Sequence, residues 1–233
     1  MPFRIRTLNA ISQVGLSRLP ADRYTVGHDV TAPDALLLRS TSLHHQPIEP
    51  SVLAVARAGA GTNNIPIPEF SKLGVPVFNT PGANANAVKE LVVAGLFLAA
   101  RNIVDAAAFA HRLEGDHATM DKLVEAGKKN YIGFELPGRT LGVIGLGAIG
   151  VEVANVALSL GMTVLGYDPG ITVQHAWALS SQVEHVTDLN ELLRRSDIVT
   201  LHVPLVAGTK GLIGAEQFRA MKSSAVLLNF ARG

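Results

Sequence analysis

Short runs of apolar residues alternate with more polar segments through the first third of the chain. Several runs are apolar at every position, which is typical of strands in a parallel sheet that helices cover on both faces. The segments between them carry turn residues or a helical spacing of apolar positions. This pattern predicts a small α/β unit with strands at residues 3–8, 24–26, 35–39, 52–57 and 75–78.

A long helical pattern follows the turn-rich segment at residues 79–84. Its apolar positions recur every three or four residues, which predicts one helix over residues 86–111. The most apolar stretch, residues 91–100, is too short to span a bilayer and contains Gly95. This stretch is either core or part of an interface with a second chain. Residues 111–136 are mixed in polarity and predict a helix plus a connector.

A second α/β unit begins at Arg139. Leu141, Val143 and Ile144 predict a buried strand, and the apolar positions of residues 151–160 predict the helix that follows it. Further strands are expected at residues 163–168, 183–186, 198–203 and 225–230, and further helices at residues 188–195 and 215–221.

The connection between that strand and helix reads Gly-x-Gly-x-x-Gly over residues 145–150. Gly145 tolerates the positive φ of a tight turn. Gly147 lets a pyrophosphate approach the backbone, and Gly150 lets the helix pack against its strand. The unpaired N–H groups at the start of the helix would then face the phosphates. Strand, glycine turn and helix in this order predict a dinucleotide-binding turn.

A carboxylate stands where such a dinucleotide would place its ribose. Asp168 ends the next predicted strand, about 20 residues after the glycines. Its oxygens can accept hydrogen bonds from the ribose hydroxyls, and charge-assisted bonds of this kind contribute roughly 1.5–3 kcal/mol. The same charge would repel a 2′-phosphate. The expected cofactor is therefore NAD rather than NADP.

Composition narrows the remaining function classes. Of the 233 residues, 48% are hydrophobic and 17% are charged, which allows a sizeable core and disfavours disorder. A formal net charge of +1 without a basic run gives no indication of a nucleic-acid partner. The chain has no cysteine, its first residues lack a signal-peptide core, and its histidines lack metal-ligand spacing. We expect a cytoplasmic protein with no metal, no membrane span and no nucleic-acid partner.

Five motifs follow one another along the chain. They are Arg57-Ala-Gly-Ala-Gly-Thr-Asn-Asn, Asn79-Thr-Pro-Gly, Gly145-Leu-Gly-Ala-Ile-Gly, Leu201-His-Val-Pro with Thr209, and Asn229-Phe-Ala-Arg-Gly. In this order they resemble the motifs of the D-isomer-specific 2-hydroxyacid dehydrogenase family, and the resemblance covers nearly the whole chain. It implies an α/β fold, with a flavodoxin-like substrate-binding domain at residues 1–97 and a Rossmann dinucleotide-binding domain at residues 98–233.

The chemistry implied by this resemblance is hydride transfer between the hydroxyl-bearing carbon of an organic acid and the nicotinamide of NAD. Arg232 stands at the family's catalytic arginine, where its planar fork suits a carboxylate and its charge stabilises a developing oxyanion. Arg39 and Arg57 each follow an apolar strand. They suit a phosphorylated acid, although both can also be solvent-facing residues at strand ends. The expected substrate-binding positions are Arg39, Ser40, Arg57, Ala58 and Gly59.

The cofactor-binding positions implied by the resemblance lie at the ends of several predicted strands. Two of them depart from the family pattern, because Ala60 stands where relatives often have Thr and Ala148 where many have Arg. Both changes remove a polar contact. The full set is Ala60, Gly145, Gly147, Ala148, Ile149, Gly150, Asp168, Val203, Pro204, Thr209, Phe230, Ala231 and Arg232.

The resemblance further implies that the chain ends early. The last Rossmann strand, the catalytic Glu/His segment and the returning segment of the substrate domain would all follow residue 233. We therefore expect a Rossmann domain that is incomplete at its C-terminal end, and low or no activity, since loss of acid–base help typically costs about 10²–10⁴-fold in rate. A truncation, a fragment or a degraded gene would each explain this end.

Three functions stay open. Leu38-Arg-Ser and the Arg57 motif look most like family members that oxidise D-3-phosphoglycerate to 3-phosphohydroxypyruvate, the first step of serine biosynthesis. One alternative is another D-2-hydroxyacid dehydrogenase, such as a glyoxylate or hydroxypyruvate reductase. The other is a non-catalytic, NAD-responsive interaction module, as in the corepressor branch of the family. The resemblance also implies a homodimer, paired through the nucleotide domain and the long helix before it.

Overall fold

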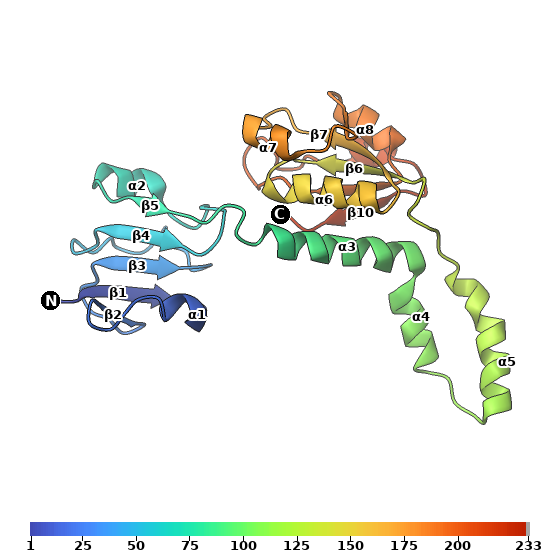
Figure 1. The fold of residues 1–233 in the computed structure, drawn as a ribbon, viewed down its shortest axis with the longest axis horizontal. Helices are drawn as coiled ribbons and strands as arrows, with labels where there is room; N and C mark the ends of the chain where they lie inside the picture. The colour runs from blue at the N-terminus through green and yellow to red at the C-terminus, as the bar shows by residue number, and fades with distance from the viewer. Residues whose placement is uncertain (232–233) are drawn as a thin grey trace. The chain divides into compact units, whose positions relative to one another are not determined.

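The structure, a computed structural model, describes residues 1–231. The chain divides into two compact units, Met1–Asn84 (unit 1) and Ala85–Gly233 (unit 2), and each contains a five-stranded sheet (Figure 1). The boundary predicted after residue 97 falls inside a helix that belongs wholly to unit 2. The assignment of unit 1 to the substrate stays a prediction.

Unit 1 has the flavodoxin-like strand order. Its strands are all parallel and lie in the order β2-β1-β3-β4-β5, which is the 2-1-3-4-5 order of doubly wound sheets of that type. Leu36 and Leu38 of β3 and Val55 of β4 form its core with Phe70 of α2. The elements are β1 (Phe3–Leu8), α1 (Gln13–Leu16), β2 (Tyr24–Gly27), β3 (Ala35–Leu38), β4 (Ala54–Arg57), α2 (Ile67–Lys72) and β5 (Val77–Phe78).

Unit 2 begins with helices α3 (Ala85–Arg101), α4 (Ile103–Ala110) and α5 (His117–Gly127), followed by the 3₁₀ helix η1 (Lys128–Tyr131). The prediction of a single helix over residues 86–111 is wrong, because α3 and α4 meet at a bend of 65°. Asn102 lies at the bend with a left-handed φ of 49°, a conformation that Asn tolerates better than most residues. Its side-chain amide donates to the Ile132 carbonyl oxygen at 3.0 Å.

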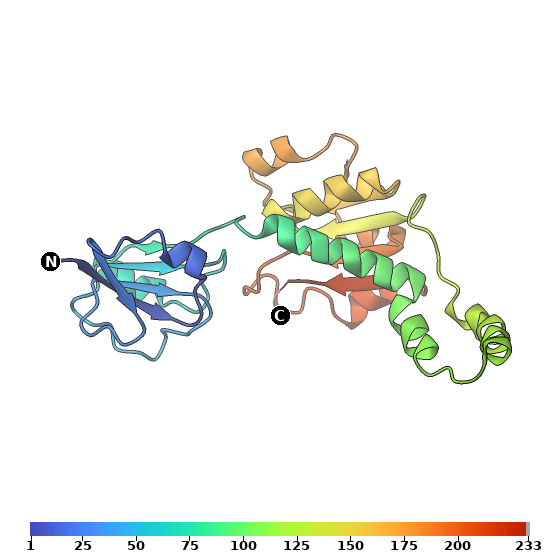
Figure 2. The ribbon, with the colours of Figure 1, turned by 60° about the horizontal axis from the view of Figure 1, so that its bottom comes forward.

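Helices α4 and α5 run away from the sheet of unit 2 and back (Figures 1 and 2). The Phe109 ring of α4 lies against Gly127 of α5, where an added Cβ would be 2.2 Å from a ring carbon. No single helix in residues 1–231 has both the length and the apolar character to cross a membrane. Within the same described residues, α3 and α4 meet those two criteria only when they are taken together across their bend.

The sheet of unit 2 is also all parallel, with the order β10-β9-β6-β7-β8. Counted from β6, this is the 3-2-1-4-5 order of a Rossmann sheet. The remaining elements are β6 (Thr140–Ile144), α6 (Ala148–Ser159), β7 (Thr163–Tyr167), α7 (Val173–Ala178), β8 (Glu184–His185), α8 (Leu189–Arg195), β9 (Ile198–Leu201), α9 (Ala215–Ala220) and β10 (Val226–Asn229).

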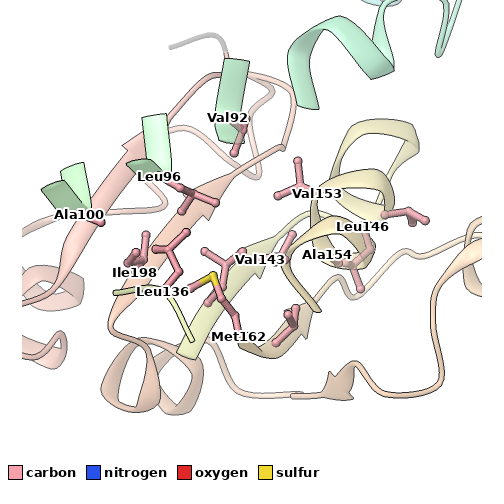
Figure 3. Close-up of a cluster of buried hydrophobic side chains, with 14 residues drawn as sticks. Val92, Leu96, Ala100, Leu136, Val143, Leu146, Val153, Ala154, Met162 and Ile198 are labelled. Carbon is pink, nitrogen blue, oxygen red and sulfur yellow. The ribbon is translucent and has the colours of Figure 1, made fainter. Parts of the chain in front are cut away.

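The main core of unit 2 lies between this sheet and helices α3 and α6. Helix α3 runs beside α6 and β10 (Figure 2). Figure 3 shows Val92, Leu96 and Ala100 of α3 in one buried cluster with Val143 of β6 and Ile198 of β9. One face of the apolar stretch at residues 91–100 is therefore core, as one of the two interpretations predicted.

Candidate functional site

The candidate site in unit 2 lies at the carboxyl ends of β6 and β9. From β6 the chain continues to β7 and β8 on one side, and it then crosses back to β9 and β10 on the other. This reversal is the topological switch point at which open α/β sheets bind ligands. The glycine turn follows β6 at this point, and residues 203–209 follow β9.

Packing explains two of the three glycines in the turn. Gly145 has a φ of +91°, and a Cβ there would lie 2.9 Å from the backbone of His202. A Cβ on Gly150 would lie 1.9 Å from the Gly145 carbonyl oxygen. Both contacts are with backbone that strand pairing holds in place, because His202 N donates to the Ile144 carbonyl oxygen at 2.8 Å. Gly145 and Gly150 are thus required by the fold itself.

Packing does not explain Gly147. A Cβ there would meet nothing within 4 Å, and its φ of −76° is ordinary for any residue. Gly147 is the N-cap of α6 and offers no side-chain cap. The first N–H groups of α6, those of Ala148, Ile149 and Gly150, have no partner within the helix. Open space next to unpaired N–H groups and the positive end of a helix fits a pyrophosphate.

Asp168 points at the glycine turn. One carboxylate oxygen accepts a hydrogen bond from Leu146 N at 2.8 Å, and the other accepts one from Gly170 N at 2.8 Å. Two backbone donors therefore fix the orientation of the carboxylate at the end of β7. Each oxygen keeps a further lone pair for another donor.

The loop after β9 carries three predicted cofactor positions. Val203 is half-buried and Pro204 is exposed. The Thr209 hydroxyl donates to the Pro204 carbonyl oxygen and accepts from Val206 N at 3.0 Å. Thr209 thus holds the loop in its conformation through bonds within the loop itself.

Sequence reasoning did not assign His202 to the site, although it stands at the strand end beside Gly145. Burial lowers its pKa from 6.5 to about 4, because it removes water from around the charged form. Its Nε2 lies 3.0 Å from the Thr200 hydroxyl oxygen. The imidazole is therefore neutral at pH 7.

Phe230, a predicted cofactor-binding residue that follows β10, packs against helix α3. The Phe230 ring packs on Gly95, where an added Cβ would lie 2.7 Å from a ring carbon. Ala231 N donates to the Asn229 side-chain oxygen at 3.0 Å. Arg232, the predicted catalytic residue, lies outside the described residues.

The predicted substrate positions of unit 1 differ in their exposure. Arg39 and Ser40 are exposed after β3. Arg57 is only 2% exposed, and its guanidinium donates to the carbonyl oxygens of Arg39 and Gly61. The N–H groups of Ala58 and Gly59 also have acceptors within unit 1, namely the Leu38 carbonyl oxygen and the Thr80 hydroxyl. Ala60 is exposed in the same loop.

The polar residues Asn9 and Asn64 also contact this loop region, and sequence reasoning missed both. Each bonds to residues 39–41 through its side chain. Asn64 is the last residue of the quoted Arg57 motif, so its place in that motif was an available signal. Asn9 directly follows a predicted strand, where an Asn is a common turn residue.

A cavity of about 830 Å³ lies elsewhere in unit 1. It is lined by the start of β1 and the connection from β2 to β3, and no described residue of the predicted site lines it. We place the candidate site at the carboxyl ends of the strands and not at this cavity, because open parallel sheets bind ligands at that edge. Within residues 1–231, no group of three or more His, Cys, Asp or Glu side chains is arranged to hold a metal ion.

Solved structures similar to this chain include two dehydrogenases. The apo form of Rhodotorula graminis D-mandelate dehydrogenase has a TM-score of 0.80 and 25% identity, over 100% of this chain and 75% of that one. The NAD⁺-bound 3-phosphoglycerate dehydrogenase of Entamoeba histolytica has a TM-score of 0.74 and 25% identity, over 100% and 72%. The predicted fold class is thereby confirmed.

Two curated relatives carry different names. A D-3-phosphoglycerate dehydrogenase of Methanocaldococcus jannaschii is 41% identical over 203 residues, which cover 86% of this chain and 36% of the relative. A hydroxypyruvate reductase of Thermotoga maritima is 38% identical over 203 residues, covering 86% and 61%. The chain spans less than two thirds of the length of either relative.

Residues 95–233 match the family model described as D-isomer specific 2-hydroxyacid dehydrogenase, NAD binding domain. This match and the NAD⁺-bound structure confirm NAD as the predicted cofactor. The chain therefore belongs to the D-isomer-specific 2-hydroxyacid dehydrogenase family, with the NAD-binding domain of that family in residues 95–233.

Proposed function

We propose that the chain takes part in the NAD-dependent oxidation of a D-2-hydroxy acid. The observation that carries the proposal is Gly147, whose missing side chain leaves open space at the start of α6. Neither backbone strain nor packing accounts for a glycine there, whereas an approaching pyrophosphate does. When bound, NAD would supply the acceptor for the hydride of the hydroxyl-bearing carbon of the acid. The residues of the chain bind and orient the reactants.

In this proposal the first N–H groups of α6, including those of Ala148 and Ile149, donate to the pyrophosphate. Asp168 accepts from the ribose hydroxyls while its two backbone donors keep it oriented. Val203 and Pro204 flank the adenosine. Asp168 also disfavours NADP, because its charge would face a 2′-phosphate.

For the acid we propose D-3-phosphoglycerate, oxidised to 3-phosphohydroxypyruvate at the start of serine biosynthesis. The exposed side chains of Arg39 and Ser40 supply a cation and a hydroxyl after β3. A guanidinium can bind phosphate or carboxylate through two parallel hydrogen bonds. Arg232 is proposed to bind the carboxylate and the reacting oxygen. The M. jannaschii relative supports this substrate, and the T. maritima relative supports hydroxypyruvate as an alternative.

Calorimetric titration with NADH and NADPH tests the cofactor assignment. The wild-type chain should bind NADH more tightly than NADPH. Asp168→Asn should weaken NADH binding by about tenfold or more, since it removes charge-assisted bonds to the ribose. Equal affinity of the wild type for the two cofactors would contradict the role of Asp168.

The substrate assignment is tested first by binding of the acids to the NADH-loaded protein. It is then tested by turnover, with NAD⁺ for 3-phosphoglycerate and with NADH for the two keto acids. 3-Phosphoglycerate is compared with glyoxylate and hydroxypyruvate. Arg39→Ala should weaken the phosphorylated acid selectively, whereas Arg18→Ala, an exposed arginine of unit 1 outside the predicted site, should change nothing. Equal losses for all acids would count against D-3-phosphoglycerate. Cofactor binding without binding of any acid would favour the non-catalytic, NAD-responsive module.

We also propose a homodimer formed through the exposed face of α3 and α4. Leu91 and Leu98 of α3 and Val104 of α4 are 56%, 43% and 63% exposed, and the other side of α3 is core. Contiguous exposed apolar side chains mark protein interfaces. The double variant Leu98→Glu and Val104→Glu should sediment as a monomer. Val173→Glu is the matched control, because Val173 is 75% exposed on α7. A wild-type chain that is monomeric at micromolar concentration would contradict the proposal.

A further inference from the structure

The loop formed by residues 39–41 has an outward and an inward side. The side chains of Arg39 and Ser40 are exposed. The backbone groups of the same residues bond to side chains from three other segments of unit 1. We propose that Asn9, Arg57 and Asn64 are positioning residues that hold this loop in one conformation and thereby orient Arg39 and Ser40 toward the acid. The proposal rests on the proposed function of those two residues.

Asn9 binds the loop from the end of β1. Its Oδ1 accepts three hydrogen bonds, from Ser40 N at 2.9 Å, from Thr41 N at 2.6 Å and from the Thr41 hydroxyl at 2.6 Å. Asn9 has a φ of 73°, in the left-handed region that Asn enters more readily than most residues. Three bonds to one oxygen offset the strain of that backbone conformation.

Arg57 and Asn64 bind the loop from the side of β4. The Arg39 carbonyl oxygen accepts from Arg57 Nε at 3.0 Å and from Asn64 Nδ2 at 3.3 Å. Asn64 Nδ2 also donates to the Thr41 carbonyl oxygen at 2.7 Å. The guanidinium of Arg57 reaches Gly61 as well, so the side chain joins the loops after β3 and β4.

The missing side chain of Gly59 makes room for this arrangement. Its φ is +153°, and an added Cβ would lie 3.2 Å from a guanidinium nitrogen of Arg57. Arg57 is 2% exposed, and its guanidinium bonds inward to the loops. Through its bond to the Arg39 carbonyl oxygen it positions the backbone of residue 39. Arg57 and Asn64 hold the Arg39 carbonyl oxygen, and the exposed guanidinium of Arg39 is the cation offered to the acid.

Asn9 offers a matched pair of variants. Asn9→Gly keeps a residue that adopts φ of 73° without strain but removes the acceptor oxygen. Asn9→Asp keeps an acceptor oxygen for all three donors. A difference between these two variants reports on the hydrogen bonds, because neither is expected to distort the backbone more than Asn does.

The first measurement is NMR-detected amide hydrogen exchange on the whole chain. In Asn9→Gly the amides of Ser40 and Thr41 should exchange about tenfold faster or more, and in Asn9→Asp they should stay close to wild type. The Val55 amide, which donates to the Pro76 carbonyl oxygen within the sheet, should stay protected in both variants and shows that unit 1 is folded. Unchanged exchange at Ser40 and Thr41 in Asn9→Gly would overturn the proposal.

The second measurement is binding of 3-phosphoglycerate to the NADH-loaded chain. Asn9→Gly should raise the Kd for 3-phosphoglycerate by about tenfold, whereas Asn9→Asp should leave it near the wild-type value. Neither variant should alter the affinity for NADH. A loosened loop with unchanged acid affinity would also overturn the positioning role. If the wild type binds no acid, the proposed function fails, and the exchange experiment still decides whether Asn9 holds the loop.

Discussion

The turn after β6 in unit 2 requires glycine at residues 145 and 150, because a side chain at either position would collide with neighbouring backbone. The loop after β3 in unit 1 is instead held by hydrogen bonds with side chains of three other segments. Both lie at the carboxyl edge of a parallel sheet. The glycine turn of unit 2 brings backbone against backbone, with Gly145 and Gly150 placed where no Cβ fits. The loop of unit 1 is open on its outer side and hydrogen-bonded on its inner side.

The difference indicates two ways of preparing a site. A pyrophosphate is bound by N–H groups, so the protein must clear space and leave donors unpaired. An organic acid with a phosphate is bound by long cationic side chains, so the protein must fix the backbone from which they extend. Substitutions in unit 2 should therefore act through added volume, and substitutions in unit 1 through lost hydrogen bonds.

The largest effect is expected for Gly150→Ala. The new methyl group would lie 1.9 Å from the Gly145 carbonyl oxygen, and that backbone cannot withdraw without breaking strand pairing. The free energy of unfolding should fall by roughly 3–5 kcal/mol, the range of severe packing defects. Denaturant titration measures this. Gly208→Ala is the control, because nothing lies within 4 Å of its added Cβ, and an equal loss in both variants would contradict the packing argument.

A smaller loss in the free energy of unfolding is expected when the pH is lowered. The pKa of His202 is about 4 in the folded chain and 6.5 in its ordinary state, so the unfolded chain binds the proton first as pH falls. Stability should therefore decrease between pH 6.5 and 4 and level off below that, by about 3 kcal/mol in total. In His202→Gln this part of the pH dependence should disappear. Identical pH profiles of unfolding for the two proteins would show that the buried imidazole is not its source.

Gly147→Ala should separate binding from folding. Its added Cβ meets nothing within 4 Å, so the free energy of unfolding should change by no more than about 0.5 kcal/mol. NADH affinity should fall by about 10–100-fold, because the methyl group takes the space of the pyrophosphate. Calorimetry and denaturant titration on the same preparation provide both values. Undiminished NADH binding would remove the main support for the cofactor site.

The smallest effect is expected for Gly95→Ala, because the added Cβ would meet the ring of a side chain and not the backbone. Gly95→Ala should gain about 0.5–1 kcal/mol of helix stability. It should lose somewhat more by pushing on the Phe230 ring, 2.7 Å away, for a net loss of about 1 kcal/mol. The double variant with Phe230→Leu should recover the loss. If the double variant is no more stable than Gly95→Ala, the ring is not the source of the strain.

Much of the fold follows from local patterns. The apolar runs predicted the strands of both sheets, and the three glycines with Asp168 predicted the turn and the acidic residue that bonds to it. The helix break was missed because apolar spacing continues through Asn102. The left-handed backbone of Asn102 is held by a hydrogen bond from the Asn102 side chain to the carbonyl oxygen of Ile132, which lies in another segment.

The sequence by itself determined the two parallel α/β units and the dinucleotide turn, because residue type and spacing within one strand–turn–helix segment specify them. Tertiary structure alone decided that Gly150 is required by packing while Gly147 faces open space. It also decided that Arg57 is buried against loop carbonyls. These outcomes depend on which atoms of other residues come within a few ångströms, and the pattern of apolar and polar residues does not specify such distances.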